Sequence, residues 1–399
     1  MSRLLRWWAA LVVLVVSAGL GGGAGLALAV PRAYADPPTA CKVTPGTADP
    51  RTMPWAQKRL GFQKVWPITD GQGVRVAVID SGVNRDQAQM APIHYSDGAN
   101  VLGGGFRADD TRDCYGHGTA VTGIIAAPKI VDVAFLGVAP GVTIVPIKQS
   151  NQQNDGTAEG VAAGIEAAIA ANVRVINISW ATKVDVAVMR DAIAKAEAHD
   201  IVVVAAASND AQSGNLAAYP AAYPTVLAVA ATDDQDQVAK FSETGSYVDL
   251  AAPGVKVEAP APKSGYQLQL DGTSFAAPFV TGTVALVRAA HPQLTAAQVR
   301  ARLEATADPP PGQTVPSQAY GYGTVNPYLA VTAVRDDAAI APRPRKQIPL
   351  PAGAPQPRPD RHLEHLALGI ATMLLGLAVV AGLTAAVVRR GTWFGQTAR

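Results

Sequence analysis

Five short apolar runs constrain the fold of this chain more than any other feature of its sequence. Each run is rich in β-branched residues and almost free of polar ones, which is typical of strands buried on both faces of a parallel sheet. The runs are 74–80 (VRVAVID), 142–148 (VTIVPIK), 173–179 (VRVINIS), 201–208 (IVVVAAAS) and 225–232 (TVLAVAAT). Because stretches with helical periodicity alternate with them, the pattern predicts an α/β fold with a doubly wound, mostly parallel sheet flanked by helices.

The helical stretches have recognisable ends. They cover 117–127, 157–172, 186–200, 274–291 and 295–307. Pro292 ends the fourth of them, and Thr295 is the expected N-cap of the fifth. Ligands of doubly wound sheets bind beyond the carboxyl ends of the strands. Asp80 and the pair Ser208–Asn209, which end two of the apolar runs, are therefore expected near a site.

The N-terminus has the pattern of a secretory signal peptide. Arg3 and Arg6 precede a long uncharged apolar run, and a small-residue triplet (AYA) ends at Ala35. We therefore expect residues 1–35 to be removed by cleavage. The alternative is an uncleaved membrane span over 9–30, but the glycines of that run weaken it as a permanent helix.

A second apolar run, 366–388, contains no charged residue and is followed by two arginines. Its length is enough to cross a bilayer, so we expect a transmembrane helix over 363–388 and a short cytoplasmic tail over 389–399. The Pro-rich, basic linker 335–362 isolates the run from the rest of the chain, which disfavours the alternative of a buried core helix. The chain is thus expected to cross a cell membrane once, with its bulk on the extracytoplasmic side.

Residues 36–70 read as a polar, turn-rich N-terminal extension that wraps the main domain, which we place at 71–334. Trp55, Phe62 and Trp66 are the residues expected to anchor this extension. Its polar composition fits two alternatives equally well: a segment that blocks a functional site, and a segment that only packs against the domain.

Two cysteines, Cys41 and Cys114, lie in the part of the chain expected to be exported. An even count in an oxidising compartment favours one disulfide between them, with two free buried thiols as the alternative.

The formal charge is nearly balanced, at 33 Lys and Arg against 31 Asp and Glu, or +2 in all. This balance lacks the basic excess of proteins that bind nucleic acid, so no nucleic-acid partner is expected.

Three polar residues lie where the predicted sheet would place a site. Asp80 ends a strand, His117 begins one helix and Ser274 begins another. A serine hydroxyl is a weak nucleophile until a base takes its proton, and the base needs a third group to fix its tautomer. Taken singly, the three could be a turn residue, a satisfied polar residue and a helix cap. Together they predict a catalytic triad.

The motifs around these residues, "VAVIDSGV", "GHGTAVTG" and "GTSFAAPFVTG", occur in the order Asp, His, Ser. In this they resemble the subtilisin-type serine proteases, the subtilases. The similarity runs from about Val74 to Pro292 and continues more weakly to about Leu329. It implies a subtilisin-like fold and peptide-bond hydrolysis with Asp80, His117 and Ser274 as the triad.

The resemblance also implies roles for residues at two other strand ends. Asn209 matches the asparagine of the oxyanion hole, which donates to the oxygen that becomes negative during acyl transfer. Ser179, Trp180 and Ala181 match the strand that pairs with the substrate, and Ser208 lies on the opposite wall of the pocket. Since Trp180, Ala181 and Ser208 are bulkier than the residues common in the family, we expect a narrow pocket that prefers a small residue such as Ala.

Two features depart from the family's pattern. Gln89 stands where the tight calcium site has a carboxylate, and 128–135 (PKIVDVAF) replaces its ligand loop. Calcium needs several oxygen ligands, so we expect no metal there, while weak calcium binding elsewhere stays open; no cofactor is implied. The extension 36–70 is also too short for the folded inhibitory pro-domain that secreted subtilases usually carry.

The order of signal, short extension, catalytic domain, linker and anchor resembles the mycosins, the membrane-anchored subtilases of actinobacterial type VII secretion systems. This resemblance implies selective cleavage of proteins exported by such a system, and stabilisation of the secretion complex through its membrane subunits. Two alternatives stay open. The chain is mainly a structural subunit with dispensable proteolysis, or it is a protease that matures surface proteins outside any such system.

Overall fold

The computed structural model describes residues 43–47, 49–102, 110–152 and 155–336, together with Thr372, Gly376, Val380, Ala381 and Ala385. Residues 1–42 and 43–399 form two separate units, and the fold below is that of the second. The expected signal peptide lies outside the described residues, as does nearly all of the linker 335–362. Of the expected membrane helix 363–388, only the five residues named above are described, and they are helical and exposed.

A parallel sheet forms the centre of the molecule, and its main strands are the five predicted runs. These are β1 (Arg75–Asp80), β4 (Thr143–Lys148), β5 (Val175–Ile178), β6 (Val202–Ala206) and β7 (Val226–Thr232). The strand order is β2-β4-β1-β5-β6-β7-β8, and all pairings in the sheet are parallel. Short strands complete its edges: β2 (His94–Tyr95), β3 (Ala99–Asn100), which pairs with β4, and β8 (Leu250–Pro253). The predicted fold class is confirmed.

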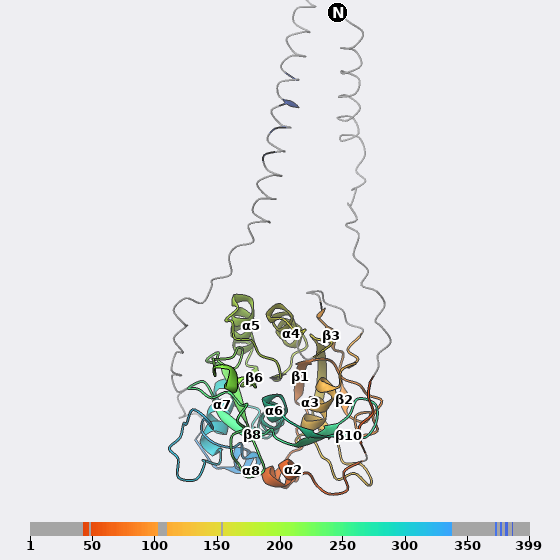
Figure 1. Ribbon diagram of the computed structural model, residues 1–399, viewed down its shortest axis with the longest axis vertical. Coiled ribbons are helices and arrows are strands. Elements are labelled where there is room, and N and C mark those ends of the chain that lie inside the picture. The colour runs from red at the N-terminus through yellow and green to blue at the C-terminus, as the bar shows by residue number, and fades with distance from the viewer. Residues whose placement is uncertain are drawn as a thin grey trace, which may run out of the picture. The chain divides into compact units, whose positions relative to one another are not determined.

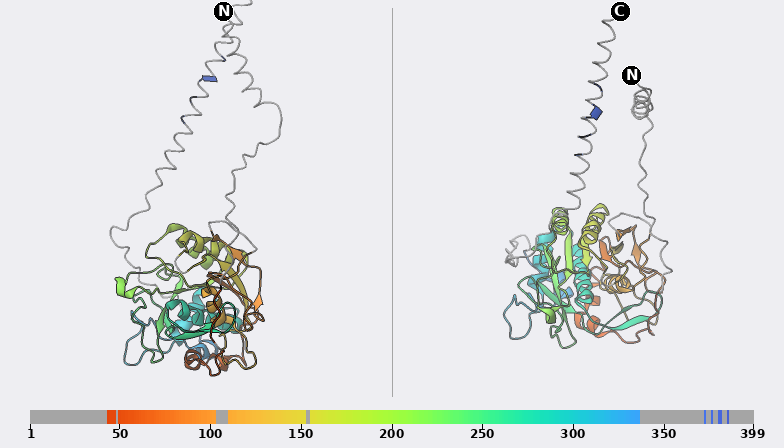
Figure 2. Two further views of the ribbon diagram at one scale, coloured as in Figure 1. Left: turned by 45° about the vertical axis from the view of Figure 1, so that its right-hand side comes forward. Right: turned by 45° about the horizontal axis from the view of Figure 1, so that its top comes forward.

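Helices cover both faces of the sheet. On one face lie α3 (His117–Ala126) and α6 (Thr273–Ala290), and on the other face lie α4 (Ala158–Ala170) and α5 (Ala187–Ala198). Helices α4 and α5 lie side by side in the views of Figures 1 and 2. Side chains along β1 point alternately to the two faces of the sheet, which explains why helices cover both. Val76 and Val78 belong to the core cluster under α3 and α6, whereas Ala77 and Ile79 belong to the cluster under α4 and α5. A strand buried on both sides needs apolar residues at every position.

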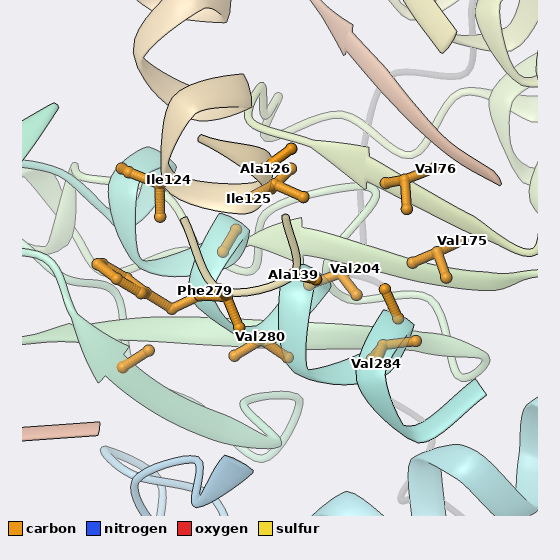
Figure 3. Packing of buried hydrophobic residues seen from close by; sticks show 14 of the residues in the cluster. Val76, Ile124, Ile125, Ala126, Ala139, Val175, Val204, Phe279, Val280 and Val284 are labelled. Carbon is orange, nitrogen blue, oxygen red and sulfur yellow. The ribbon is translucent and has the colours of Figure 1, made fainter. Parts of the chain in front are cut away.

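Helix α6 is almost wholly buried in the fold. In Figure 3 its Phe279, Val280 and Val284 pack beside Ile124 and Ile125 of α3 and face strand residues of the sheet. Within the described part of the chain, α6 is the one helix long and apolar enough to cross a membrane, and 83% of it is buried inside the fold. Its apolar character is therefore explained by core packing.

The segment before the sheet folds onto the domain through its aromatic residues. It contains α2 (Trp55–Leu60) and the short 3-10 helix η1 (Phe62–Val65), and Phe62 is fully buried in the core. The indole N–H groups of Trp55 and Trp66 donate to the backbone carbonyls of Lys256, at 3.1 Å, and Val138, at 3.0 Å.

The C-terminal part adds α7 (Ala296–Thr306) and α8 (Pro327–Thr332), and a separate antiparallel ribbon is formed by β9 (Val257–Pro260) and β10 (Tyr266–Leu270). Thr295 caps α7 as predicted, in a capping box with Gln298. The pattern of the sequence did not predict α8, β8 or the ribbon.

Candidate active site

Strand ends and helix starts bring the three predicted triad residues into one cleft. Asp80 is the last residue of β1, His117 the first of α3 and Ser274 the second of α6. They line a cavity of about 200 Å³, together with Asn209. The cleft lies at the carboxyl ends of β1, β5 and β6, where doubly wound sheets bind their ligands.

Asp80 and His117 are joined by a hydrogen bond. The Nδ1–Oδ1 distance is 2.8 Å, and Asp80 is buried, with 4% of its surface exposed. The same oxygen accepts the backbone N–H of Ser81 at 2.7 Å, which fixes the carboxylate. Because an ionised carboxylate only accepts, Nδ1 of His117 carries the proton and Nε2 is left free to act as a base.

Asp113 is a further residue of the site, which sequence reasoning missed. Its buried carboxylate accepts hydrogen bonds from the Ser81 hydroxyl (2.9 Å), the Gly116 N–H (2.7 Å), and both the N–H (2.9 Å) and the hydroxyl (2.7 Å) of Thr119. It thus ties the turn after β1 to the start of α3, where a negative charge is favoured by the helix dipole. The only sequence signal was an acidic residue four positions before His117.

The pKa of His117 is raised above its ordinary value of 6.5. Burial by itself would lower it, because a charged ring loses hydration. The charge of Asp80, the hydrogen bond to Asp80 and the charge of Asp113 outweigh that cost. The site therefore favours an imidazolium, the form that a general base reaches after taking a proton.

Ser274 and Ser179 are linked through reciprocal contacts between α6 and the end of β5. The Ser274 hydroxyl donates to the Ser179 carbonyl at 3.4 Å, and the Ser179 hydroxyl donates to the Ser274 carbonyl at 3.0 Å. Among the described residues, Ser274 makes no hydrogen bond to His117. Loose contacts between nucleophile and base are common without substrate and tighten when the substrate binds.

The side chain of Asn209 is oriented by α6. Its Oδ1 accepts the backbone N–H of Thr273 at 2.8 Å and the Thr273 hydroxyl at 2.9 Å. With the oxygen occupied, the amide NH₂ points away from Thr273, and Asn209 lines the same cleft as Ser274. This group can therefore donate to an oxygen that sits beside the Ser274 hydroxyl.

The structure also places the four predicted substrate-binding residues in this cleft. Ser179, Trp180 and Ala181 follow β5, and Ser208 follows β6. Ser208 has a φ of 88°, in the left-handed region that favours glycine. The serine is held there by its neighbours, since its N–H donates to the Thr273 hydroxyl at 3.2 Å.

Gln149 lines the cleft as well and was not predicted. It follows directly after β4 and is 4% exposed, and its Oε1 has no hydrogen-bond partner in the described part of the protein. Its position at a strand's carboxyl end was the signal that could have found it.

Gln89, expected to replace a calcium ligand, makes direct bonds instead. Its buried amide donates to the carbonyls of Pro128 (2.6 Å) and Phe135 (2.8 Å) and accepts from the Tyr266 hydroxyl. Over the ranges that the structure describes, no group of three or more His, Cys, Asp or Glu side chains could hold a metal ion.

Cys114 lies three residues before His117 and is disulfide-bonded. Cys41 lies outside the described residues, so its pairing with Cys114 stays a prediction.

Known proteins are similar to this chain over most of its length. The Subtilase family matches residues 71–323. Subtilisin DY of Bacillus licheniformis is 38% identical over 64% of this chain and 90% of its own length. Mycosin-4 of Mycobacterium tuberculosis is 36% identical over 82% of this chain and 80% of its own. The solved structure of the MycP3 protease from the type VII (ESX-3) secretion system superposes with a TM-score of 0.63 at 32% identity, covering 74% of this chain and 92% of that one.

Proposed function

The chain belongs to the subtilase family and is a serine endopeptidase similar to the mycosins, and from this premise we propose that it cleaves selected proteins exported by a type VII secretion system. The observation that carries the catalytic part is the Asp80–His117 hydrogen bond in a cleft shared with Ser274 and Asn209.

In the proposed mechanism, the Ser274 hydroxyl turns from the Ser179 carbonyl to Nε2 of His117. His117 takes its proton as Oγ attacks the substrate carbonyl, and later gives that proton to the leaving amine. Asp80 holds the imidazole in the required tautomer and stabilises its charge. The Asn209 amide and the Ser274 N–H donate to the oxyanion. Water then releases the acyl group by the same steps, with His117 again taking and returning the proton.

The secretion role rests on the relatives. Similarity to Mycosin-4 covers 82% of this chain, and the MycP3 relative is named as a protease of a type VII secretion system. We propose the same setting here, with the catalytic domain on the extracytoplasmic side, anchored by the helix expected over 363–388. Its partners are the exported substrates and membrane subunits of the secretion complex.

The test is made in the producing cell, by deleting the gene and restoring either the parent or Ser274→Ala. We expect substrate processing to return only with the parent. Secretion that returns with Ser274→Ala would assign the chain an additional structural role. Unchanged processing in the deletion strain would contradict the proposal.

Asn209→Ala is expected to lower kcat by about 10²–10³, the loss known for the corresponding donor in subtilisin, with little change in KM. The amide contacts an oxygen whose charge exists only in the transition state, so substrate binding should hardly change. The measurement is steady-state kinetics on a peptide substrate. Gln212→Ala, which removes an exposed amide nearby, is the matched control and should retain parental kinetics.

The acid limb of kcat/KM is expected to have its midpoint above pH 6.5, because only neutral His117 can accept a proton and its pKa is raised. Stability should respond in the opposite sense. The contribution of protonated His117 is fully present below about pH 6.5 and is lost as pH rises through the raised pKa. A pH series of kcat/KM with thermal unfolding at each pH checks both, and a midpoint below 6.5 would contradict the first.

A further inference from the structure

The proposed mechanism fixes where the substrate residue before the cleaved bond must lie. With its carbonyl carbon at Ser274 and its carbonyl oxygen at Asn209, its side chain enters the space between the end of β5 (179–181) and the end of β6 (206–208). Residues of both segments line the cleft. We call this space the specificity pocket, and the inference below rests on the proposed function.

An ion pair contacts one wall of this pocket through Ser208. The Lys183 ammonium bonds to the Glu243 carboxylate, and it also donates to the Ser208 hydroxyl at 3.3 Å and the Leu216 carbonyl at 3.5 Å. Neither Lys183 nor Glu243 lines the cleft itself, whereas Ser208 does. The ammonium is thus one hydrogen bond away from the space that a substrate side chain would occupy.

The carboxylate of this pair is held inside the protein. The Glu243 side chain has no exposed surface, and its second oxygen accepts the Tyr247 hydroxyl at 3.4 Å. Its backbone N–H donates to the carbonyl of Ser208 at 3.1 Å. Burial raises the pKa of Glu243, against the opposing hydrogen bond and charge of Lys183. An isolated charge in such a place is costly, so the Glu243 carboxylate depends on the Lys183 ammonium.

We propose that the Lys183–Glu243 pair closes the back of the specificity pocket and is the determinant that restricts it to small, uncharged side chains. The long Lys183 side chain ends against the Ser208 hydroxyl, and Glu243 neutralises the ammonium that would otherwise attract an acidic side chain. Asp210 also lines the cleft, accepts the Ser208 hydroxyl at 3.3 Å and has its carboxylate 3.6 Å from the ammonium, so the Lys183 charge offsets this second carboxylate as well.

The experiment uses the full chain and a set of internally quenched peptides that differ only in the residue before the cleaved bond: Ala, Leu, Phe, Asp or Lys. The parent is expected to cleave best after Ala. Lys183→Ala/Glu243→Ala removes both charges and opens the space, so the kcat/KM ratio for Leu or Phe over Ala should rise by about tenfold or more. The size-matched control Lys183→Met/Glu243→Leu should keep the parental ratio within about threefold.

A second variant tests the charge of Glu243 without changing the size of its side chain. It also provides a test if the double alanine variant fails to fold. Glu243→Gln removes the buried negative charge that bonds to the ammonium and leaves only the more distant, exposed Asp210, so kcat/KM for Asp relative to Ala should rise by about tenfold. Unchanged ratios in Glu243→Gln and in the double alanine variant would overturn the proposal, as would a parent that cleaves best after Phe. A parent that cleaves no peptide would instead count against the proposed function.

Discussion

Ser274→Ala is expected to lower kcat on a peptide substrate by about 10⁶, the loss known for the nucleophile of subtilisin. The variant keeps the cleft, the Asn209 donor and the Asp80–His117 pair, but no side-chain atom remains that can form the acyl intermediate. The residual rate, about 10³–10⁴ above that in water, comes from substrate binding and the oxyanion donors. Single-turnover kinetics with an excess of enzyme is sensitive enough to measure it.

A matched control removes a hydroxyl elsewhere. Ser213 lies on the short 3-10 helix η3 (Ala211–Ser213), is exposed and does not line the cleft. Ser213→Ala should have parental kinetics, and both variants should unfold at the parental temperature. A Ser274→Ala enzyme that keeps more than about 1% of the parental kcat would rule out Ser274 as the nucleophile.

Asp80→Asn is expected to lower kcat at neutral pH by about 10⁴, as removal of the carboxylate does in known serine proteases. An asparagine amide can donate to Nδ1 of His117, which would place the ring proton on Nε2, facing the serine that must give up its own. The pKa of His117 should fall as well, because burial then acts without the opposing charge of Asp80. The acid limb of the pH profile should therefore move to lower pH.

The control for this variant is Asp86→Asn, an exposed carboxylate a few residues along the chain. It removes the same formal charge from the same region and should change neither kcat nor the acid limb. If Asp80→Asn lost activity but left the pH profile in place, the carboxylate would only orient His117 and would not set its pKa.

Local periodicity was enough to predict the centre of the fold. The five apolar runs became β1, β4, β5, β6 and β7 within two residues of their predicted ends, since strands buried on both faces allow few polar substitutions. The triad residues end or begin such elements, so their meeting in one cleft followed from the topology.

What the sequence did not predict depends on contacts between distant segments. The strand β8 (Leu250–Pro253) is short and rich in small residues, and it is a strand because β7 lies beside it. Asp113 acts by accepting a hydrogen bond from Ser81 in the turn after β1. The Lys183–Glu243 pair joins residues 60 positions apart. Neither the contact of Asp113 with Ser81 nor the Lys183–Glu243 pair follows a local sequence pattern. Both become visible only in the three-dimensional structure.

Because α6 is buried in the core, the segment that carries the nucleophile Ser274 can unfold only when the domain unfolds. Ser274 sits on the first turn of a helix that contacts β5, β6, β7 and β8 as well as α3, α7 and α8. Such an element opens only with the cooperative unit around it, at close to the full free energy of unfolding. Amide protons of α6 should therefore exchange among the slowest in the chain. For a protease this gives resistance to cleavage by other copies of itself. A neighbouring copy cannot cut the segment carrying Ser274 until the target domain has already unfolded.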